Sequence, residues 1–383
     1  MLKRVICLLL CLLLIIPSAL ADFDRDDLDA QVGKIFKNYK TTGGALIVAK
    51  HGEIVYERYY GYAYKKAKEL VEPDTYFRIA SVTKMISAIR VMQLVEQGLL
   101  DLDEDISTYL GYEIKNPNTP KVPITLRTIM THTTSLNSNS GYSRESNTLS
   151  YLIAVASKHR NNFYKYAPGT TYKYSNFGAG IMGSLMEAVT GQNVNTVVTE
   201  GLFEPLGIDA AYHATLLQQP EKISCIYSKS GSTSRARSAF LNDKWDSSVN
   251  PDKHYRITVG SLWVKPRDLC RLGIMLCNGG TLDGVTVLQP ETVAEMMASQ
   301  MGRGVVTIDS PYGLCVNRID NLLPGKMIYG HQGLINDAVC NLYFDPETEL
   351  VFAMVTNGGT SKMDDHIAIV SRKLFNLVYS TFN

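Results

Sequence analysis

Ser81 and Lys84 are the two residues of this sequence whose types and spacing best suit nucleophilic chemistry. Residues 76–80 before them have a strand-like composition, and an apolar helix is expected to follow. A spacing of i and i+3 places the serine hydroxyl and the lysine amine on one face of the first helical turn. A buried amine beside the amides of a helix N-terminus loses its proton more easily. Lys84 could therefore accept the Ser81 proton, and the Ser81 N–H could stabilise an oxyanion.

The S-x-x-K pattern is weak when taken alone, because a capping serine followed by a surface lysine is common. Two features favour the catalytic interpretation. Ser81 is the only serine in the chain that has a lysine three residues later. Residues 82–100 are apolar almost all round, so the expected helix offers no simple solvent-facing side for Lys84.

Two further motifs carry groups that could act on a substrate. In Tyr174-Ser175-Asn176, a phenol near a cation can share in proton transfer, and an amide can hold a carbonyl group. Standing alone, they would be a turn tyrosine and a helix-capping asparagine. In Gly330-His331-Gln332-Gly333, a glycine at a strand would let substrate backbone approach, although a lone histidine is more often structural. His132 is interpreted as structural as well.

The secondary structure that must position these motifs is divided between the two ends of the chain and its middle. Alternating or continuous apolar patterns predict strands at 43–49, 53–64, 339–344 and 350–355. Residues 101–259 are mostly helical stretches separated by polar loops. This order predicts an α+β fold, in which one antiparallel sheet is assembled from both ends of the chain and carries an inserted all-helical subdomain.

The composition is that of an ordinary globular protein. Of 383 residues, 45% are hydrophobic and 20% are charged, with 38 Lys+Arg against 37 Asp+Glu. This balance gives no reason to expect nucleic acid or an anionic membrane as a partner. The sequence contains no H-E-x-x-H or C-x-x-C motif, so it implies no metal and no cofactor.

The first 21 residues have the features of a cleaved secretory signal peptide. A basic start is followed by the apolar run 5–16 and by a small-x-small site that ends at Ala21. The run is too short to span a bilayer, which takes about 20 helical residues. We therefore expect cleavage after Ala21 and a secreted or periplasmic protein without a stable membrane anchor. Among the remaining cysteines, Cys315 with Cys340 is the one disulfide pairing considered.

The three motifs, in this order and at these separations, resemble the serine β-lactamase and penicillin-binding-protein superfamily. The likeness is to its class C-like branch of β-lactamases, esterases, DD-peptidases and D-aminopeptidases. It extends over nearly the whole chain after the signal peptide. Beyond the three motifs it includes the segments 94–106, 124–133, 168–191 and 260–273.

The resemblance implies a role for each motif residue. Ser81 would be the acylated nucleophile, Lys84 its base, and Tyr174 the group that relays protons to the leaving group and to water. The substrate-binding residues would be Asn176, His331, Gly333 and Leu334, the last through a backbone N–H that completes the oxyanion hole with that of Ser81.

The resemblance also implies a five-stranded antiparallel sheet flanked by helices, in a single hydrolase domain over residues 22–383. Its sheet subdomain would comprise residues 22–80 and 260–383, and its helical subdomain residues 100–259. His331 stands where many relatives have lysine, and the loss of that fixed charge makes efficient β-lactam hydrolysis less expected.

The leading hypothesis is an exported serine hydrolase that forms an acyl-enzyme on Ser81. Its substrate would be a small-molecule or peptide-like ester or amide, including D-amino-acid or cell-wall-like material. A β-lactamase or a penicillin-sensitive DD-carboxypeptidase is the alternative within enzymes. A non-catalytic ligand-binding or sensor protein on the same fold is the alternative of another class, and oligomeric state is left open.

Overall fold

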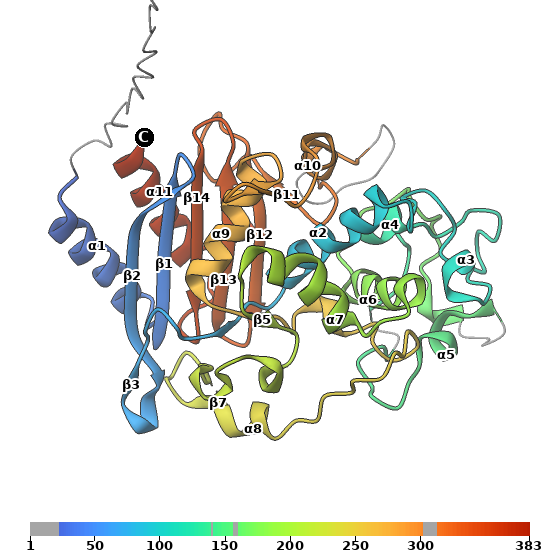
Figure 1. Cartoon of the computed structure of the whole chain (residues 1–383), viewed down its shortest axis with the longest axis horizontal. Coiled ribbons are helices and arrows are strands. Elements are labelled where there is room, and N and C mark those ends of the chain that lie inside the picture. Colours follow the sequence, from blue (N-terminus) through green and yellow to red (C-terminus); the bar gives the residue numbers. More distant parts are fainter. Residues whose placement is uncertain (1–22, 139–140, 156–159, 302–311) are drawn as a thin grey trace, which may run out of the picture.

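The computed structural model describes residues 23–138, 141–155, 160–301 and 312–383. The predicted signal peptide, residues 1–21, lies outside these ranges and stays a prediction. Within the described residues, the helices are all too short or too polar to cross a membrane. Figure 1 shows a sheet-containing half and a helical half, joined by the long helix α2 (Val82–Glu96).

The main sheet is antiparallel and combines strands from both ends of the chain, in the order β11-β12-β13-β14-β1-β2-β3. Its strands are β1 (Gly43–Lys50), β2 (Glu53–Tyr64), β3 (Glu69–Leu70), β11 (Asn317–Ile319), β12 (Ile328–Ile335), β13 (Ala338–Asp345) and β14 (Leu350–Thr356). Five of them are long, as predicted, but the sheet has seven strands. The additional β3 and β11 are two- and three-residue edge strands, too short to produce a clear sequence pattern.

Both faces of this sheet are covered, which explains why β1 is apolar from Gly43 to Ala49 and buried along its whole length. Ala45, Ile47 and Ala49 on one face pack into the core that contains α2 and α9 (Pro266–Cys277). Leu46 and Val48 on the other face pack against α1 (Arg25–Asn38) and α11 (Ile369–Phe382). In Figure 1 the N-terminal strand β1 lies beside the C-terminal strand β14.

The helical half is built around α2 and α6 (Asn176–Thr190), which contact each other. The other helices are α3 (Ser107–Leu110), α4 (Leu126–Met130), α5 (Leu149–Ile153), α7 (Val194–Val198), α8 (Arg237–Leu241) and α10 (Pro290–Met297). Three short strands also occur within 100–259: β5 (Ala210–Ala211), β6 (Ile226–Tyr227) and β7 (Thr233–Arg235). The division into two subdomains at the predicted boundaries stays a proposal.

Several small strands lie outside the main sheet, and short 3-10 or π-helical turns occur in the connecting segments. These strands are β4 (Phe77–Arg78), β8 (Trp263–Val264), β9 (Thr281–Leu282), β10 (Val285–Thr286), β15 (Met363–Asp364) and β16 (Ile367–Ala368). The most relevant is β8, which pairs with β4 just before Ser81 and with β5 from the helical half. Cys315 and Cys340 are both buried and free, so the disulfide considered for them does not form.

Candidate active site

Ser81 caps the N-terminus of α2, directly after a sharp change in chain direction. Strand β4 ends at Arg78, and Ala80 then adopts a left-handed backbone conformation with φ of 47°. Such a conformation costs a non-glycine residue of the order of 1–3 kcal/mol and often occurs at functional sites. The helix that follows is buried on most sides. The fold thus holds Ser81 at the start of a rigid, central helix.

Lys84 lies one helical turn further on and is completely buried. Its Nζ donates to Ser81 Oγ at 2.9 Å and to the Val259 carbonyl oxygen at 2.7 Å. Burial lowers the pKa of the Lys84 ammonium from 10.5 to about 7. Near neutral pH a large fraction of Lys84 is therefore uncharged, and its lone pair can accept the Ser81 proton over the same contact.

Tyr174 lies just before α6, and its side chain faces the same cavity as Ser81. Lys84 Nζ is 5.2 Å from the centre of the Tyr174 ring. Burial raises the pKa of the Tyr174 phenol above its usual range, while interaction with the Ser81 hydroxyl opposes this shift. Because 40% of Tyr174 is exposed, the effect of burial is smaller than in a closed core. The phenol is neutral near pH 7 and can donate a proton.

Asn176 is the first residue of α6, which Ser175 caps by accepting from the Gly178 N–H at 3.0 Å. The side-chain oxygen of Asn176 is buried and has no hydrogen-bond partner among the described residues. A buried acceptor without a partner costs about 1–3 kcal/mol unless a ligand satisfies it. Asn176 thus has an unpaired acceptor close to Tyr174 in the chain, although it does not line the cavity over Ser81.

The Gly330-His331-Gln332-Gly333 motif lies in β12, next to the Ser81 turn. A Cβ at Gly333 would lie 2.4 Å from the Ile79 carbonyl oxygen and 2.9 Å from the Ser81 backbone nitrogen. Glycine is therefore required for β12 to approach the nucleophile this closely. Leu334, the next residue, is 42% exposed and lines the cavity.

His331 is buried and neutral. Its Nδ1 lies 2.7 Å from the Gln332 carbonyl oxygen, to which it donates, so its Nε2 accepts from the Tyr312 hydroxyl at 3.2 Å. Burial and the nearby Lys84 lower the pKa of the His331 imidazole to about 3. His331 therefore supplies no positive charge, and its two ring nitrogens hydrogen-bond the Gln332 carbonyl and the Tyr312 hydroxyl.

An open strand edge accompanies these residues. Strand β11 pairs with β12 only from Ile328 to Gly330. Within the described residues, the remainder of β12, up to Ile335, has no neighbouring strand on that side. An exposed edge of this kind can hydrogen-bond an extended peptide-like substrate.

A cavity of about 410 Å³ opens over Ser81. It is lined by Ser81, Tyr172, Tyr174, Tyr312, Asn317, Arg318, Ile319, Asn321, His331, Gln332, Leu334, Tyr343, Asp365, His366 and Ile367. Its size suits a small organic or short peptide-like molecule. The end near Ser81 is aromatic, and the charged side chains Arg318 and Asp365 lie among the remaining lining residues.

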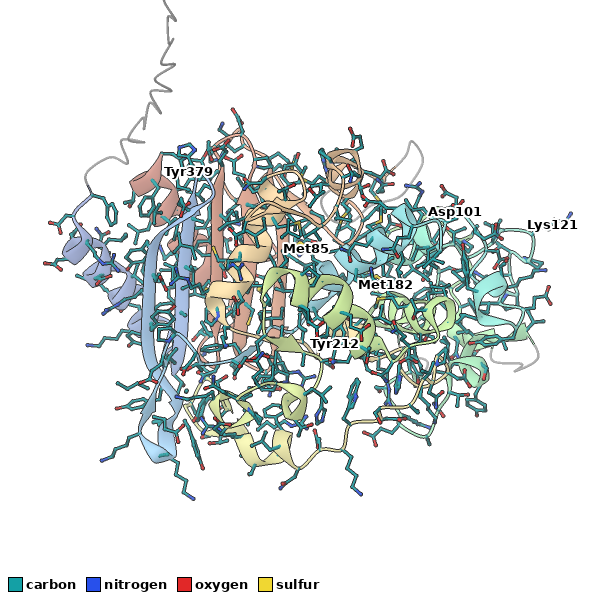
Figure 2. All side chains as sticks on the ribbon, in the orientation of Figure 1. Met85, Asp101, Lys121, Met182, Tyr212 and Tyr379 are labelled. Atoms are coloured by element: carbon teal, nitrogen blue, oxygen red, sulfur yellow. The ribbon has the colours of Figure 1, made fainter. Side chains whose placement is uncertain are left out.

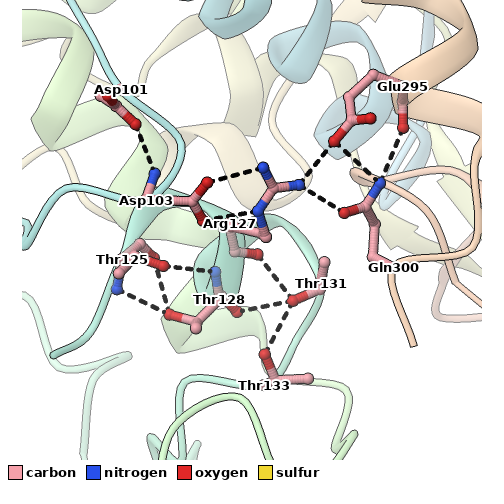
Figure 3. Close-up of polar contacts among 9 residues, drawn as sticks. All are labelled: Asp101, Asp103, Thr125, Arg127, Thr128, Thr131, Thr133, Glu295 and Gln300. Atoms are coloured by element: carbon pink, nitrogen blue, oxygen red, sulfur yellow. Dashed lines mark hydrogen bonds and ion pairs between the residues drawn. The ribbon is translucent and has the colours of Figure 1, made fainter. Parts of the chain in front are cut away.

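The segment 125–133, whose His132 packs against Tyr174, is fixed by a polar network (Figure 3). A capping box between Thr125 and Thr128 starts α4. Arg127 bridges Asp103 and Glu295, both at 2.7 Å, and so ties α4 to α10. The threonines at the end of α4 are linked as well, because the hydroxyls of Thr131 and Thr133 lie 2.9 Å apart. His132, between these two, is held in place.

The structure brings Ser81, Lys84, Tyr174, His331 and Leu334 together and places Gly333 beside Ser81. Asn176 follows Tyr174 in the chain but does not line the cavity. Sequence reasoning missed three participants: the Val259 carbonyl that contacts Lys84, the Tyr312 hydroxyl that contacts His331, and His132 beside Tyr174. The carbonyl and Tyr312 produce no sequence signal. His132 lies in segment 124–133, which contributed to the resemblance.

Known proteins were compared with the chain. It is 29% identical over 218 residues to esterase EstB of Burkholderia gladioli, a match that covers 52% of this chain and 54% of the esterase. It is 25% identical over 165 residues to protein flp of Staphylococcus aureus strain N315, covering 43% of this chain and 33% of flp. The chain thus spans about half of one relative and a third of the other.

The fold is similar to that of an octameric penicillin-binding protein homologue from Pyrococcus abyssi. That structure has a TM-score of 0.72 at 19% identity, with coverage of 94% of this chain and 77% of the other. The D-amino acid amidase of Ochrobactrum anthropi SV3, solved with D-phenylalanine, has a TM-score of 0.69 at 20% identity, with coverage of 93% and 99%.

The family model described as "Beta-lactamase" matches residues 27–375, nearly all of the described chain. Its span includes the Ser81 turn, the Tyr174 segment and strand β12. The chain therefore belongs to the Beta-lactamase family, within the serine β-lactamase and penicillin-binding-protein superfamily.

Proposed function

We propose that the protein is a serine hydrolase that forms an acyl-enzyme on Ser81 and cleaves an ester, amide or peptide bond. The observation that carries this proposal is the fully buried Lys84, whose Nζ lies 2.9 Å from Ser81 Oγ and whose pKa is about 7. A lysine with this environment is an effective base near neutral pH. The matching esterase and the amidase-like fold support the same reaction class.

In the proposed reaction, Ser81 Oγ bonds to the substrate carbonyl carbon as its proton moves to Lys84 Nζ. The carbonyl oxygen becomes an oxyanion, which the backbone N–H groups of Ser81 and Leu334 would stabilise. Removing one such donor typically costs 10²–10³ in rate, as a general guide. Collapse expels the leaving group, which takes a proton relayed through Tyr174, and leaves an ester on Ser81.

Water then hydrolyses the ester on Ser81. Its proton passes to the base formed by Lys84 and Tyr174, and its oxygen attacks the acyl carbon, so that acid is released and the Ser81 hydroxyl is restored. The neutral His331 offers no charge to a substrate carboxylate. This favours ester or amide substrates, including D-amino-acid or cell-wall-like ones, over efficient β-lactam turnover. We extend the proposal to export after cleavage at Ala21.

The test is covalent labelling with a fluorophosphonate probe, followed by peptide mass spectrometry. We expect one adduct, on Ser81, that is lost in Ser81→Ala and retained in a control, the exposed Ser232→Ala. Equal labelling of wild type and Ser81→Ala would refute the mechanism. Turnover of p-nitrophenyl esters should exceed turnover of nitrocefin, and the opposite order would make a β-lactamase the better description.

A further inference from the structure

His132 is buried beside Tyr174, behind the residues that line the cavity. It is 2% exposed, and its ring centre lies 4.3 Å from that of Tyr174. The rings of Tyr312 and Tyr172 lie 5.1 and 6.1 Å away. His132 therefore packs against three aromatic side chains that line the cavity with Ser81, a position that the sequence-based interpretation as a structural histidine did not specify.

Two hydrogen bonds connect His132 to the chain on either side of Tyr174. The His132 carbonyl oxygen accepts from the Lys173 N–H at 2.9 Å. The His132 Nδ1 accepts from the Ser175 N–H at 3.2 Å. The backbone of Tyr174 is thus held between two hydrogen bonds to a single residue, which fixes the point from which its phenol projects.

The ring of His132 is neutral in this arrangement. Because Nδ1 accepts a hydrogen bond, the single proton of the neutral ring lies on Nε2. Burial, together with the positive charge of Lys84, lowers the pKa of His132 well below its usual value. Nε2 is buried and has no partner among the described residues. A buried donor without a partner costs about 1–3 kcal/mol.

The backbone of His132 is strained as well. Its φ is 57°, in the left-handed region, which costs a non-glycine residue of the order of 1–3 kcal/mol. Threonine contacts on both sides hold it there. Thr131 Oγ1 donates to the Arg127 carbonyl oxygen at 2.7 Å (Figure 3), and the Thr133 N–H donates to the Thr128 carbonyl oxygen at 2.9 Å. Two unfavourable features thus coincide at a buried residue that hydrogen-bonds the chain on either side of Tyr174.

We propose that His132 is a positioning residue, which holds Tyr174 in register with Ser81 and Lys84 through the Ser175 N–H. The inference rests on the proposed function, because Tyr174 is the proton relay there. A displacement of about 1 Å can cost about 10²-fold in rate. The loss in kcat/KM should be largest for an ester whose leaving group needs a proton, such as an ethyl ester. It should be small for a p-nitrophenyl ester of the same acid.

Two amide substitutions separate the loss of the Nδ1 acceptor from the loss of side-chain volume. In His132→Asn the side-chain oxygen can replace Nδ1 as acceptor, whereas His132→Gln places its amide near Nε2 and leaves the Ser175 N–H unpaired. We expect His132→Asn to stay within tenfold of wild type on the ethyl ester, and His132→Gln and His132→Leu to lose about 10²-fold. His254→Leu, at a buried histidine bound to Glu187, is the control for general destabilisation.

A double-mutant cycle gives the decisive result. In a Tyr174→Phe background, His132→Leu should change kcat/KM by less than twofold, because the residue it positions has already lost its hydroxyl. An equal loss in both backgrounds, or His132→Asn as damaging as His132→Gln, would overturn the proposal. If His132→Leu does not fold, the Asn and Gln pair carries the test. Failure of Ser81 labelling would refute the proposed function instead, so the two failures are distinguishable.

Discussion

Replacing Lys84 with methionine should make the protein less active and, near neutral pH, more stable. The fully buried Lys84 has a pKa of about 7 in the folded state and 10.5 as its ordinary value. That difference corresponds to about 5 kcal/mol that disfavours the buried charge. Methionine removes this penalty and, at the same time, the contacts to Ser81 and Val259.

The pH dependence of the free energy of unfolding shows whether the buried Lys84 causes this difference in stability. Between pH 7 and 10.5 the unfolded chain holds a proton on Lys84 that the folded chain has released, so wild-type stability gains up to about 1.4 kcal/mol per pH unit from this group. Below pH 7 both states are protonated and the full penalty applies. Lys84→Met lacks this slope, and its stability advantage should therefore shrink as pH rises from 7 to 10.

Urea unfolding followed by circular dichroism, at intervals from pH 6 to 10, measures this difference. The exposed Lys121, which Figure 2 labels far from the sheet, provides the control Lys121→Met, whose curve should parallel that of wild type. Parallel curves for wild type and Lys84→Met would refute the inference of a depressed lysine pKa. The same variant should lose about 10²–10⁴ in kcat/KM at pH 8, as expected for removal of a general base.

Three further predictions follow from the described contacts. The kcat/KM of wild type should rise with pH through an apparent pKa of about 7 as Lys84 becomes neutral, and a profile that is flat from pH 6 to 8 would contradict this. Gly333→Ala should lower kcat by about 10²–10³, because its Cβ would push β12 away from the Ser81 N–H, and esterase kinetics measure the loss. Glu187→Gln should lower the free energy of unfolding by about 3 kcal/mol, because the buried Glu187 carboxylate binds His254 at 2.6 Å. Glu295 is half-exposed, so Glu295→Gln should cost less than about 1 kcal/mol in the same urea titration.

Local patterns were sufficient to predict much of this architecture. Continuous or alternating apolar residues identified β1 and β2, and the helix expected within the apolar range 82–100 is α2, which ends at Glu96. The two edge strands were missed because two or three residues carry too little periodicity. The spacing of Ser81 and Lys84 indicated their proximity because both lie in one helical turn.

Contacts between segments that are distant in the sequence could not be predicted. The Val259 carbonyl is 175 residues from Lys84, and any residue type could provide it. The importance of His132 depends on a left-handed φ and on two hydrogen bonds to residues 173 and 175, none of which has a periodic signature. Such features follow from tertiary packing of α4 against the start of α6.

The electrostatics of the site have a consequence for its choice of substrate. Above pH 7 the ionisable groups closest to Ser81, namely Lys84, Tyr174 and His331, are mostly neutral. The first large charges then appear during the reaction, as the substrate oxyanion and the protonated Lys84. Opposite charges created together in a low-dielectric site attract strongly, which offsets the cost of charging a buried amine. A site that is neutral before the reaction and dipolar during it favours uncharged acyl groups, and a substrate with a carboxylate beside the scissile bond should gain no binding energy from these residues.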